Sequence, residues 1–324
     1  MKYKLPKVKA MKTRVNAAKM LSCWQCLLVM VAWYLTCSSL AFSQESAESP
    51  ESPSAVPVVV TGQEIVAQAA AQMTLHPSLE AKMRQRVGIR DQYMVGSGAY
   101  LQLRHGEDVR FRLELRLQVG EKLTSLQHIT DSRYLYIRRD IGDTKSISRI
   151  DLKRVGAARS KLTPGNSPQS YASLGVGGLS QLLHGLADNF AFGDPDSETI
   201  SGVNVWRMSG QWKPEVLASL LPDQSEAILA GQPLAAESLP PQLPDSVSLV
   251  VGRDGPLPLF PYRVEFDRRV AGNDRPRSML IMELFEVRLR PDLDPRLFEV
   301  PDNEQDLVDE TDVYLRKHGL APAE

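Results

Sequence analysis

The chain contains five histidines, the side chains most often used for acid–base catalysis and metal binding near neutral pH. They lack the spacing of a metal site, and neither a His-Glu-x-x-His motif nor a Gly-x-Ser-x-Gly motif occurs. No catalytic set can be assembled from the residues present, so we expect no enzyme, no cofactor and no metal. The histidines are His76, His105, His128, His184 and His318.

Two short motifs resemble parts of chemical sites. Gly175-x-Gly177-Gly178 has the wrong spacing for a dinucleotide-binding loop and does not follow a convincing strand. Asp194-Pro195-Asp196 resembles part of a calcium loop but lacks the remaining ligands. We assign no function to the first motif and interpret the second as a turn.

Charged and polar residues within strands offer a further kind of chemistry. His128 lies in the middle of a predicted strand, where a hydrogen-bonded structural role is favoured over a catalytic one. The pairs Arg138-Arg139 and Arg268-Arg269 lie at strand ends, where they could bind anionic head groups. Charged strand edges that block aggregation explain these arginines more simply.

The N-terminal segment has seven Lys and Arg residues before an apolar stretch from Met20 to Phe42. This arrangement is typical of an export signal. Ala41-Phe42-Ser43 matches the small-x-small pattern before a cleavage site, so the mature chain would start near Gln44. We predict a signal peptide over residues 1–43. The alternative is an uncleaved membrane anchor, because the apolar stretch is nearly long enough to span a bilayer.

All three cysteines, Cys23, Cys26 and Cys37, lie within this segment. The Cys23-x-x-Cys26 pair is therefore interpreted as part of the signal and not as a redox or metal motif. A mature chain without cysteine can form no disulfide, hold no zinc on thiolates and use no cysteine nucleophile. The signal predicts a periplasmic or cell-envelope location.

The length and charge of the chain limit its class. With 324 residues the chain can bury a substantial core in one large domain. The formal net charge is −1, whereas nonspecific binding to nucleic acid needs a basic surface. We therefore expect no nucleic-acid partner.

Strands dominate the predicted fold. From Val109 to Val119, apolar residues alternate strictly with charged or polar ones, so one face of this strand is apolar and the other meets water. Short turns separate it from its neighbours, and because no crossover helix fits between them, these strands must be antiparallel. The predicted strands span residues 93–103, 109–119, 122–131, 134–139, 146–151, 199–200, 203–209, 246–252, 261–267 and 277–289.

Helices are predicted around this sheet. Apolar residues near helical spacing from Gly62 to about Val87 predict two helices separated at Pro77. The fold class is α+β: a large curved antiparallel sheet, in effect an unclosed β-barrel, with covering helices. The other predicted helices span residues 151–161, 179–186, 213–221 and 302–318.

The composition divides the chain into four regions. Residues 1–43 form the signal or anchor, and residues 44–60 form a disordered Ser/Pro/Glu tether with too few apolar residues to fold. Residues 61–303 form the half-barrel domain, and residues 304–324 form a C-terminal acidic helix and tail. Within the domain, residues 161–173 are predicted to be a loop and residues 222–244 an irregular insertion over one end of the sheet.

The apolar strand faces are the most informative feature. The last long strand is apolar on both faces around Leu280–Phe285, which is typical of a strand buried on both sides. Such residues can form a plain core or can line a cavity for a hydrophobic ligand. The residues predicted to line a hydrophobic cavity are Phe111, Leu113, Leu115, Leu117, Trp206, Met208, Val264, Phe266, Ile281 and Phe285.

Together, the export signal, the N-terminal helix, the meander of amphipathic strands and the late segment Leu297-Phe298-Glu299-Val300-Pro301 after Asp294 resemble a known family. The chain is similar to the outer-membrane lipoprotein-sorting carriers, the LolA/LolB-like proteins. The resemblance covers residues 62–301 at the level of element order. It implies an unclosed antiparallel barrel, lidded by helices, that holds acyl chains in a hydrophobic cavity.

The resemblance leads to two functional hypotheses. In the first, an exported envelope protein binds acyl chains of a lipid or lipoprotein, as a carrier or periplasmic chaperone. In the second, a membrane-anchored structural or sensory protein has a filled core, carries no lipid and contacts envelope membrane proteins.

Overall fold

The computed structural model describes residues 60–320 except 90–91, 120–121, 161–173, 235–238, 242, 271–272, 301–306 and 318–319. The predicted signal over residues 1–43 and nearly all of the predicted tether over residues 44–60 lie outside the described residues. The predicted loop over residues 161–173 also lies outside them.

The domain is built on one 13-stranded sheet, which confirms the predicted α+β class. The strand order is β13-β6-β5-β4-β3-β2-β1-β12-β11-β10-β9-β7, and β8 pairs with β9 outside this path. All pairings are antiparallel except that of β13 with β6, and the path ends at β13 and β7, so the sheet is unclosed. The strands are β1 (Leu79–Ile89), β2 (Gln92–His105), β3 (Asp108–Val119), β4 (Lys122–Thr130), β5 (Tyr134–Ile141), β6 (Thr144–Asp151), β7 (Phe190–Phe192), β8 (Asp196–Ile200), β9 (Val203–Trp212), β10 (Ser246–Gly252), β11 (Pro261–Val270), β12 (Asn273–Leu289) and β13 (Leu307–Asp309).

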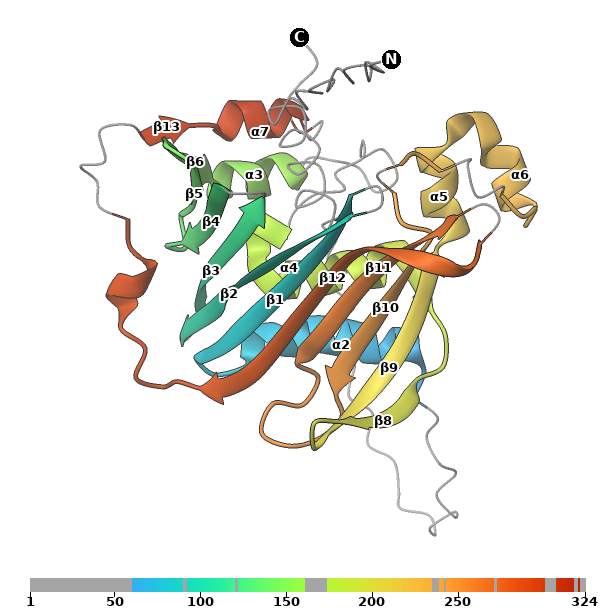
Figure 1. The fold of residues 1–324 in the computed structure, drawn as a ribbon, viewed down its shortest axis with the longest axis horizontal. Coiled ribbons are helices and arrows are strands. Elements are labelled where there is room, and N and C mark those ends of the chain that lie inside the picture. Colours follow the sequence, from blue (N-terminus) through green and yellow to red (C-terminus); the bar gives the residue numbers. More distant parts are fainter. Residues whose placement is uncertain are drawn as a thin grey trace, which may run out of the picture.

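The helices cover one face of this sheet and its ends (Figure 1). In Figure 1, α2 and α4 lie behind the sheet, α5 and α6 lie at one end, and α3 and α7 lie beside β6. We call the face covered by α2 and α4 the inner face and the opposite face the outer face. The helices are α2 (Gly62–Leu75), α3 (Leu152–Arg159), α4 (Leu174–Asn189), α5 (Pro214–Leu220), α6 (Ser225–Leu229) and α7 (Thr311–Lys317), with 3-10 turns η1 (Pro222–Gln224) and η2 (Pro295–Phe298).

Helix α2 begins at a capping box. The Thr61 hydroxyl accepts a hydrogen bond from the backbone N–H of Glu64, and the Glu64 carboxylate accepts one from the backbone N–H of Thr61. The helix ends just before His76 and Pro77, because proline disfavours a helical conformation in the residue before it. The first of the two helices predicted in this region is therefore present.

The second predicted helix is wrong, because residues 79–89 form strand β1 instead. Leu79, Ala81, Met83 and Val87 are buried at alternate positions on the inner face. A spacing of four residues, as between Leu79 and Met83, brings two side chains to the same side of a helix and of a strand. That spacing could not decide between the two structures.

The C-terminal segment also differs from the prediction of one helix over residues 302–318. Leu307–Asp309 forms the edge strand β13, and α7 begins only at Thr311. The Asp309 carboxylate accepts a hydrogen bond from the backbone N–H of Thr311, which fixes the turn between the two elements. Residues 302–306 and 318 lie outside the described residues.

Three further elements were not predicted. The three-residue strand β7 pairs with β9 at the sheet edge, and it is too short to give an alternating pattern. The segment predicted as an irregular insertion contains η1 and α6.

Glycine at position 98 allows β2 and β3 to lie close together. A Cβ atom on Gly98 would lie 1.8 Å from the backbone oxygen of Glu114 on the paired strand. Gly98 is paired with Leu115, and the backbone of β3 takes up the space that a larger side chain at position 98 would need.

Two apolar clusters hold the layers together. The large cluster joins the inner face of the sheet to α2 and α4, and Met73, Leu182, Leu183 and Leu186 are among its fully buried helical contributors. The small cluster lies on the outer face, where the segment around η2 covers β2, β4 and β5. Its buried members are Leu103, Ile129, Tyr136, Leu293 and Phe298.

Candidate functional site

Most of the predicted cavity residues lie on one continuous apolar surface. Seven of them are buried on the inner face in the large cluster, together with side chains from α2 and α4. Trp206 is partly buried against the same cluster. The seven are Phe111, Leu113, Leu115, Leu117, Met208, Val264 and Phe266.

Ile281 and Phe285 do not join this surface. The inner-face residues of β12 are Leu280 and Met282, which pair with Phe266 and Val264 of β11. Ile281 points to the opposite face, as does Phe285, whose ring lies 5.4 Å from the Arg84 guanidinium carbon. The placement of these two residues on the inner wall is wrong.

The cause of this error is the composition of β12. Apolar residues occupy both faces of the strand, so alternation alone could not assign the inner one. The charge of Glu283 was the available signal, because Glu283 lies between Ile281 and Phe285 on the same face and pairs with Arg263. The residues missed by sequence reasoning are Leu280, Met282 and Leu284.

Helix α4 is interrupted above the inner face. Gly177 and Gly178 have non-helical backbone angles, and Gly178 has φ +61°, which only glycine adopts readily. A Cβ atom on Gly178 would lie 3.0 Å from the Phe111 ring and 3.2 Å from the Tyr100 hydroxyl. Gly177 and Gly178, to which we assigned no function from the sequence, therefore break the helix directly over the predicted wall.

A few polar groups lie on the inner face among the apolar residues. The Tyr100 hydroxyl donates to Oε1 of Gln102 at 2.9 Å, and Nε2 of Gln102 donates to the backbone oxygen of Met73 at 3.0 Å. These bonds tie β2 to the end of α2. Burial raises the pKa of Tyr100 above its ordinary value, so the hydroxyl stays protonated.

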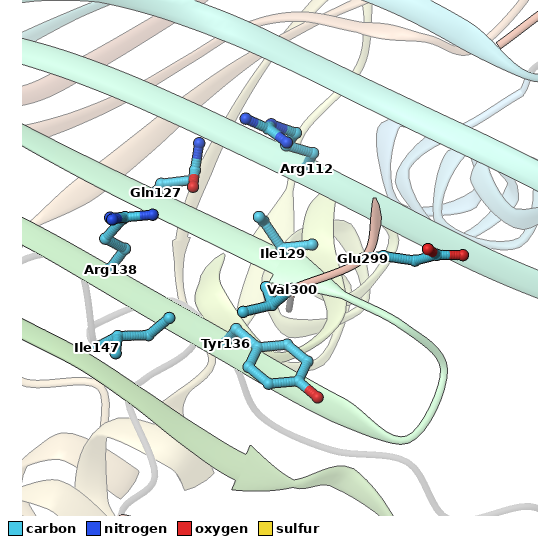
Figure 2. A pocket seen from close by; sticks show the side chains of 8 residues that line it. All are labelled: Arg112, Gln127, Ile129, Tyr136, Arg138, Ile147, Glu299 and Val300. Carbon is cyan, nitrogen blue, oxygen red and sulfur yellow. The ribbon is translucent and has the colours of Figure 1, made fainter. Parts of the chain in front are cut away.

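The outer face of β3, β4 and β5 carries a polar groove beside the segment that follows η2. Figure 2 shows its narrow end, a pocket of about 130 Å³ between the strands and Val300. A wider depression of about 350 Å³ continues from it and shares Arg112, Gln127 and Arg138. Hydrogen bonds already occupy much of this polar lining: Glu114 accepts from Arg112 at 2.7 Å and from Gln127 at 2.8 Å.

The arginines of the pair at positions 268 and 269 are engaged in the fold. The Arg268 guanidinium donates to the backbone oxygens of Pro240 and Leu243, and Arg269 forms an ion pair with Asp245 at 3.0 Å. These contacts fasten the loop before β10.

Among the residues described, no three or more His, Cys, Asp or Glu side chains come together as metal ligands would. Within the same residues, no helix has both the length and the apolar character needed to cross a membrane.

Comparisons with known proteins find distant structural likeness only. No protein-family model and no curated protein matches the sequence. A protein domain named for outer membrane lipoprotein sorting, from Vibrio parahaemolyticus, has 10% identity and a TM-score of 0.29 over 74% of this chain and 96% of that chain. The lipoprotein LppX of Mycobacterium tuberculosis has 11% identity and a TM-score of 0.34 over 72% of this chain and 100% of that chain.

A third similar structure is the Pseudomonas aeruginosa MucA/MucB complex. It has 9% identity and a TM-score of 0.34, and the match covers 73% of this chain but only 60% of that chain. Likeness at this distance carries no argument about function, so the function is argued from the geometry of the chain itself.

Proposed function

We propose that this chain is an exported envelope protein that binds acyl chains of a lipid or lipoprotein between the inner face of its sheet and the helices α2 and α4. The proposal involves no catalysis. The observation that carries it is the continuous apolar surface shared by the sheet and both helices. Acyl chains entering this layer would lose contact with water, and each buried methylene contributes about 0.8 kcal/mol to binding.

The break in α4 supports an opening of this layer. Gly177 and Gly178 separate the first turn of α4 from the rest of the helix, and Gly178 lies against Phe111 of the wall. Glycines permit large changes in backbone angles at low cost. In the proposed mechanism, the helices move away from the sheet at this point and the acyl chain takes their place against β3.

A second candidate function is favoured by the tight cover of the inner face. Leu115 and Met208 are each only 1% exposed beneath the helices. A permanently filled core would suit a structural or sensory envelope protein without lipid cargo. The two candidates differ in one measurable property, the binding of acyl chains.

Native mass spectrometry of the mature protein, purified gently from a bacterial envelope fraction, tests the proposal. We expect a mass that corresponds to cleavage near Gln44 together with bound lipid. Leu115→Asp would place a charge in the acyl layer and should abolish lipid retention. Arg116→Ala is the matched control, because Arg116 is the next residue of β3 and is exposed on the outer face.

Because Leu115→Asp can also prevent folding, Phe111→Ala provides a second measurement. This substitution removes a ring from the wall beside Gly178, and the enlarged space should accept a longer acyl chain. A folded Leu115→Asp protein that keeps its lipid would contradict the assigned face. A wild-type protein that neither carries lipid nor binds added palmitate would favour the second candidate.

A further inference from the structure

Two polar side chains lie next to each other on the inner face, at the side of the apolar wall where β4 and β5 run. His128 of β4 is paired with Leu113 of β3 and Ile137 of β5. Arg139 is paired with Leu126 of β4, so it is the diagonal neighbour of His128 on the same face. A polar pair beside an apolar wall is where the polar end of an amphipathic ligand would lie.

His128 is buried with an unsatisfied ring nitrogen. The residue is 7% exposed, and its Nδ1 has no hydrogen-bond partner in the part of the chain that the structure describes. Burial, and then the positive charge of Arg139, lower the pKa of His128 to about 3, so the imidazole is neutral near neutral pH. In a neutral imidazole, the ring nitrogen that carries the proton can donate one hydrogen bond to a ligand oxygen.

Within the described part of the chain, the charged group of Arg139 has only long contacts. Its Nη1 lies 3.5 Å from Oγ of Ser148 and 3.9 Å from a carboxylate oxygen of Glu310. Charge-assisted hydrogen bonds between guanidinium and carboxylate are normally about 2.7–2.9 Å long. The Arg139 side chain is 25% exposed and that of Glu310 is 38% exposed, so Glu310 can turn to water when another anion approaches.

We propose that His128 and Arg139 form a head-group subsite for a single-chain acyl ligand with an anionic head group, a carboxylate or a phosphate monoester. This inference rests on the proposed acyl-binding function. The head group would bind the Arg139 guanidinium and take one hydrogen bond from His128. The acyl chain would extend over Leu113 and Leu115 on the neighbouring strand.

Three probes with the same chain length distinguish the head group from the chain: palmitate, 1-palmitoyl lysophosphatidic acid and hexadecanol. Their binding to the wild-type mature protein is compared with binding to Arg139→Gln by calorimetry or displacement of a fluorescent acyl probe. We expect Arg139→Gln to weaken at least one anionic probe by about tenfold to a hundredfold, the worth of a charge-assisted hydrogen bond. Its affinity for hexadecanol should be unchanged.

Arg138→Gln is the matched control, because Arg138 is the preceding residue of β5 and lines the outer groove. It should bind all three probes as the wild type does. His128→Phe, which fills the site but offers no hydrogen bond, should weaken the anionic probes and leave hexadecanol unaffected. Palmitate and lysophosphatidic acid tell whether the carboxylate or the phosphate is preferred.

The outcomes separate the two proposals. If hexadecanol binds the wild type as tightly as both anionic probes, or if Arg139→Gln weakens all three equally, the head-group subsite is wrong while the acyl site stands. If none of the three probes binds the wild type, the acyl-binding function itself fails, and this subsite fails with it. Thermal unfolding of each variant excludes a simple loss of fold.

Discussion

At the scale of single residues, the buried His128 makes the stability of the protein depend on pH. The folded protein holds this imidazole neutral, because burial and the nearby Arg139 lower its pKa to about 3. In the unfolded chain the same side chain takes up a proton near its ordinary pKa of about 6.5. The unfolded state therefore gains protons first, and the free energy of unfolding falls as the pH drops from about 6.5 toward 3.

We predict that His128→Leu reduces this loss of stability. Between pH 7.5 and pH 5, protonation of the unfolded His128 costs the wild type about 2 kcal/mol, at 1.36 kcal/mol per pH unit below the unfolded pKa. Urea unfolding at the two pH values measures the change. The control His105→Leu, at the exposed end of β2, should lose as much stability as the wild type. An equal loss in His128→Leu would contradict the neutral state of the ring.

At the scale of elements, Gly98 determines how closely β2 and β3 can approach. Its absent Cβ would lie only 1.8 Å from a backbone oxygen of β3, and backbone cannot move aside as a flexible side chain does. The two strands together carry Tyr100, Gln102 and the wall residues of β3.

We predict that Gly98→Ala lowers the free energy of unfolding by about 1–3 kcal/mol, as overpacked cores do. Gly156→Ala in α3 is the control, because a Cβ there meets nothing within 4 Å and alanine favours a helix over glycine. Denaturant unfolding compares the two. A Gly98→Ala protein as stable as the wild type would mean that β2 and β3 can separate without cost.

The elements also show what the sequence could and could not predict. Strands β3 and β10 were predicted closely. Strict alternation along β3 and a short apolar run in β10 each favour a strand. The segment from Pro77 to about Val87 was assigned to a helix because the spacing of Leu79 and Met83 suits both structures. The pairing of β1 with its neighbour β2 and with β12, which lies far along the chain, decides that these residues form a strand.

At the scale of the whole molecule, the chain's last strand covers an edge of the sheet. β13 pairs with β6 in parallel over Leu307–Asp309, and Arg149 of β6 forms an ion pair with Asp309 at 3.1 Å. Without this cover, the eight-residue strand β6 would present unpaired backbone groups to other molecules.

We predict that Val308→Pro causes concentration-dependent self-association, because proline cannot donate to a strand ladder. Val308 is 57% exposed, so the substitution leaves the core intact. Analytical ultracentrifugation at several concentrations measures the effect. The control Val313→Ala on α7, at a similarly exposed position, should sediment as the wild type does at every concentration. A Val308→Pro protein that sediments unchanged at all concentrations would show that β6 is protected by other means.

The fold class was predictable at this scale, whereas the arrangement of the wall was only partly so. A run of short strands with tight turns permits little but a large antiparallel sheet. The inner position of Phe111, Leu115 and Leu117 followed from alternation within one strand. The place of Ile281, and the cover supplied by α2 and α4, depend on which elements meet in three dimensions, and no local pattern contains that information.

The pairing of β1 with β12 has a consequence for how the molecule is made. Leu79 lies opposite Leu289, so two central neighbours of the sheet are separated by most of the polypeptide. Contacts between such distant residues make folding slow, since the intervening loop must close first. While the chain is being synthesised, the edge of β1 that pairs with β12 therefore stays without its partner until nearly the whole domain has been made.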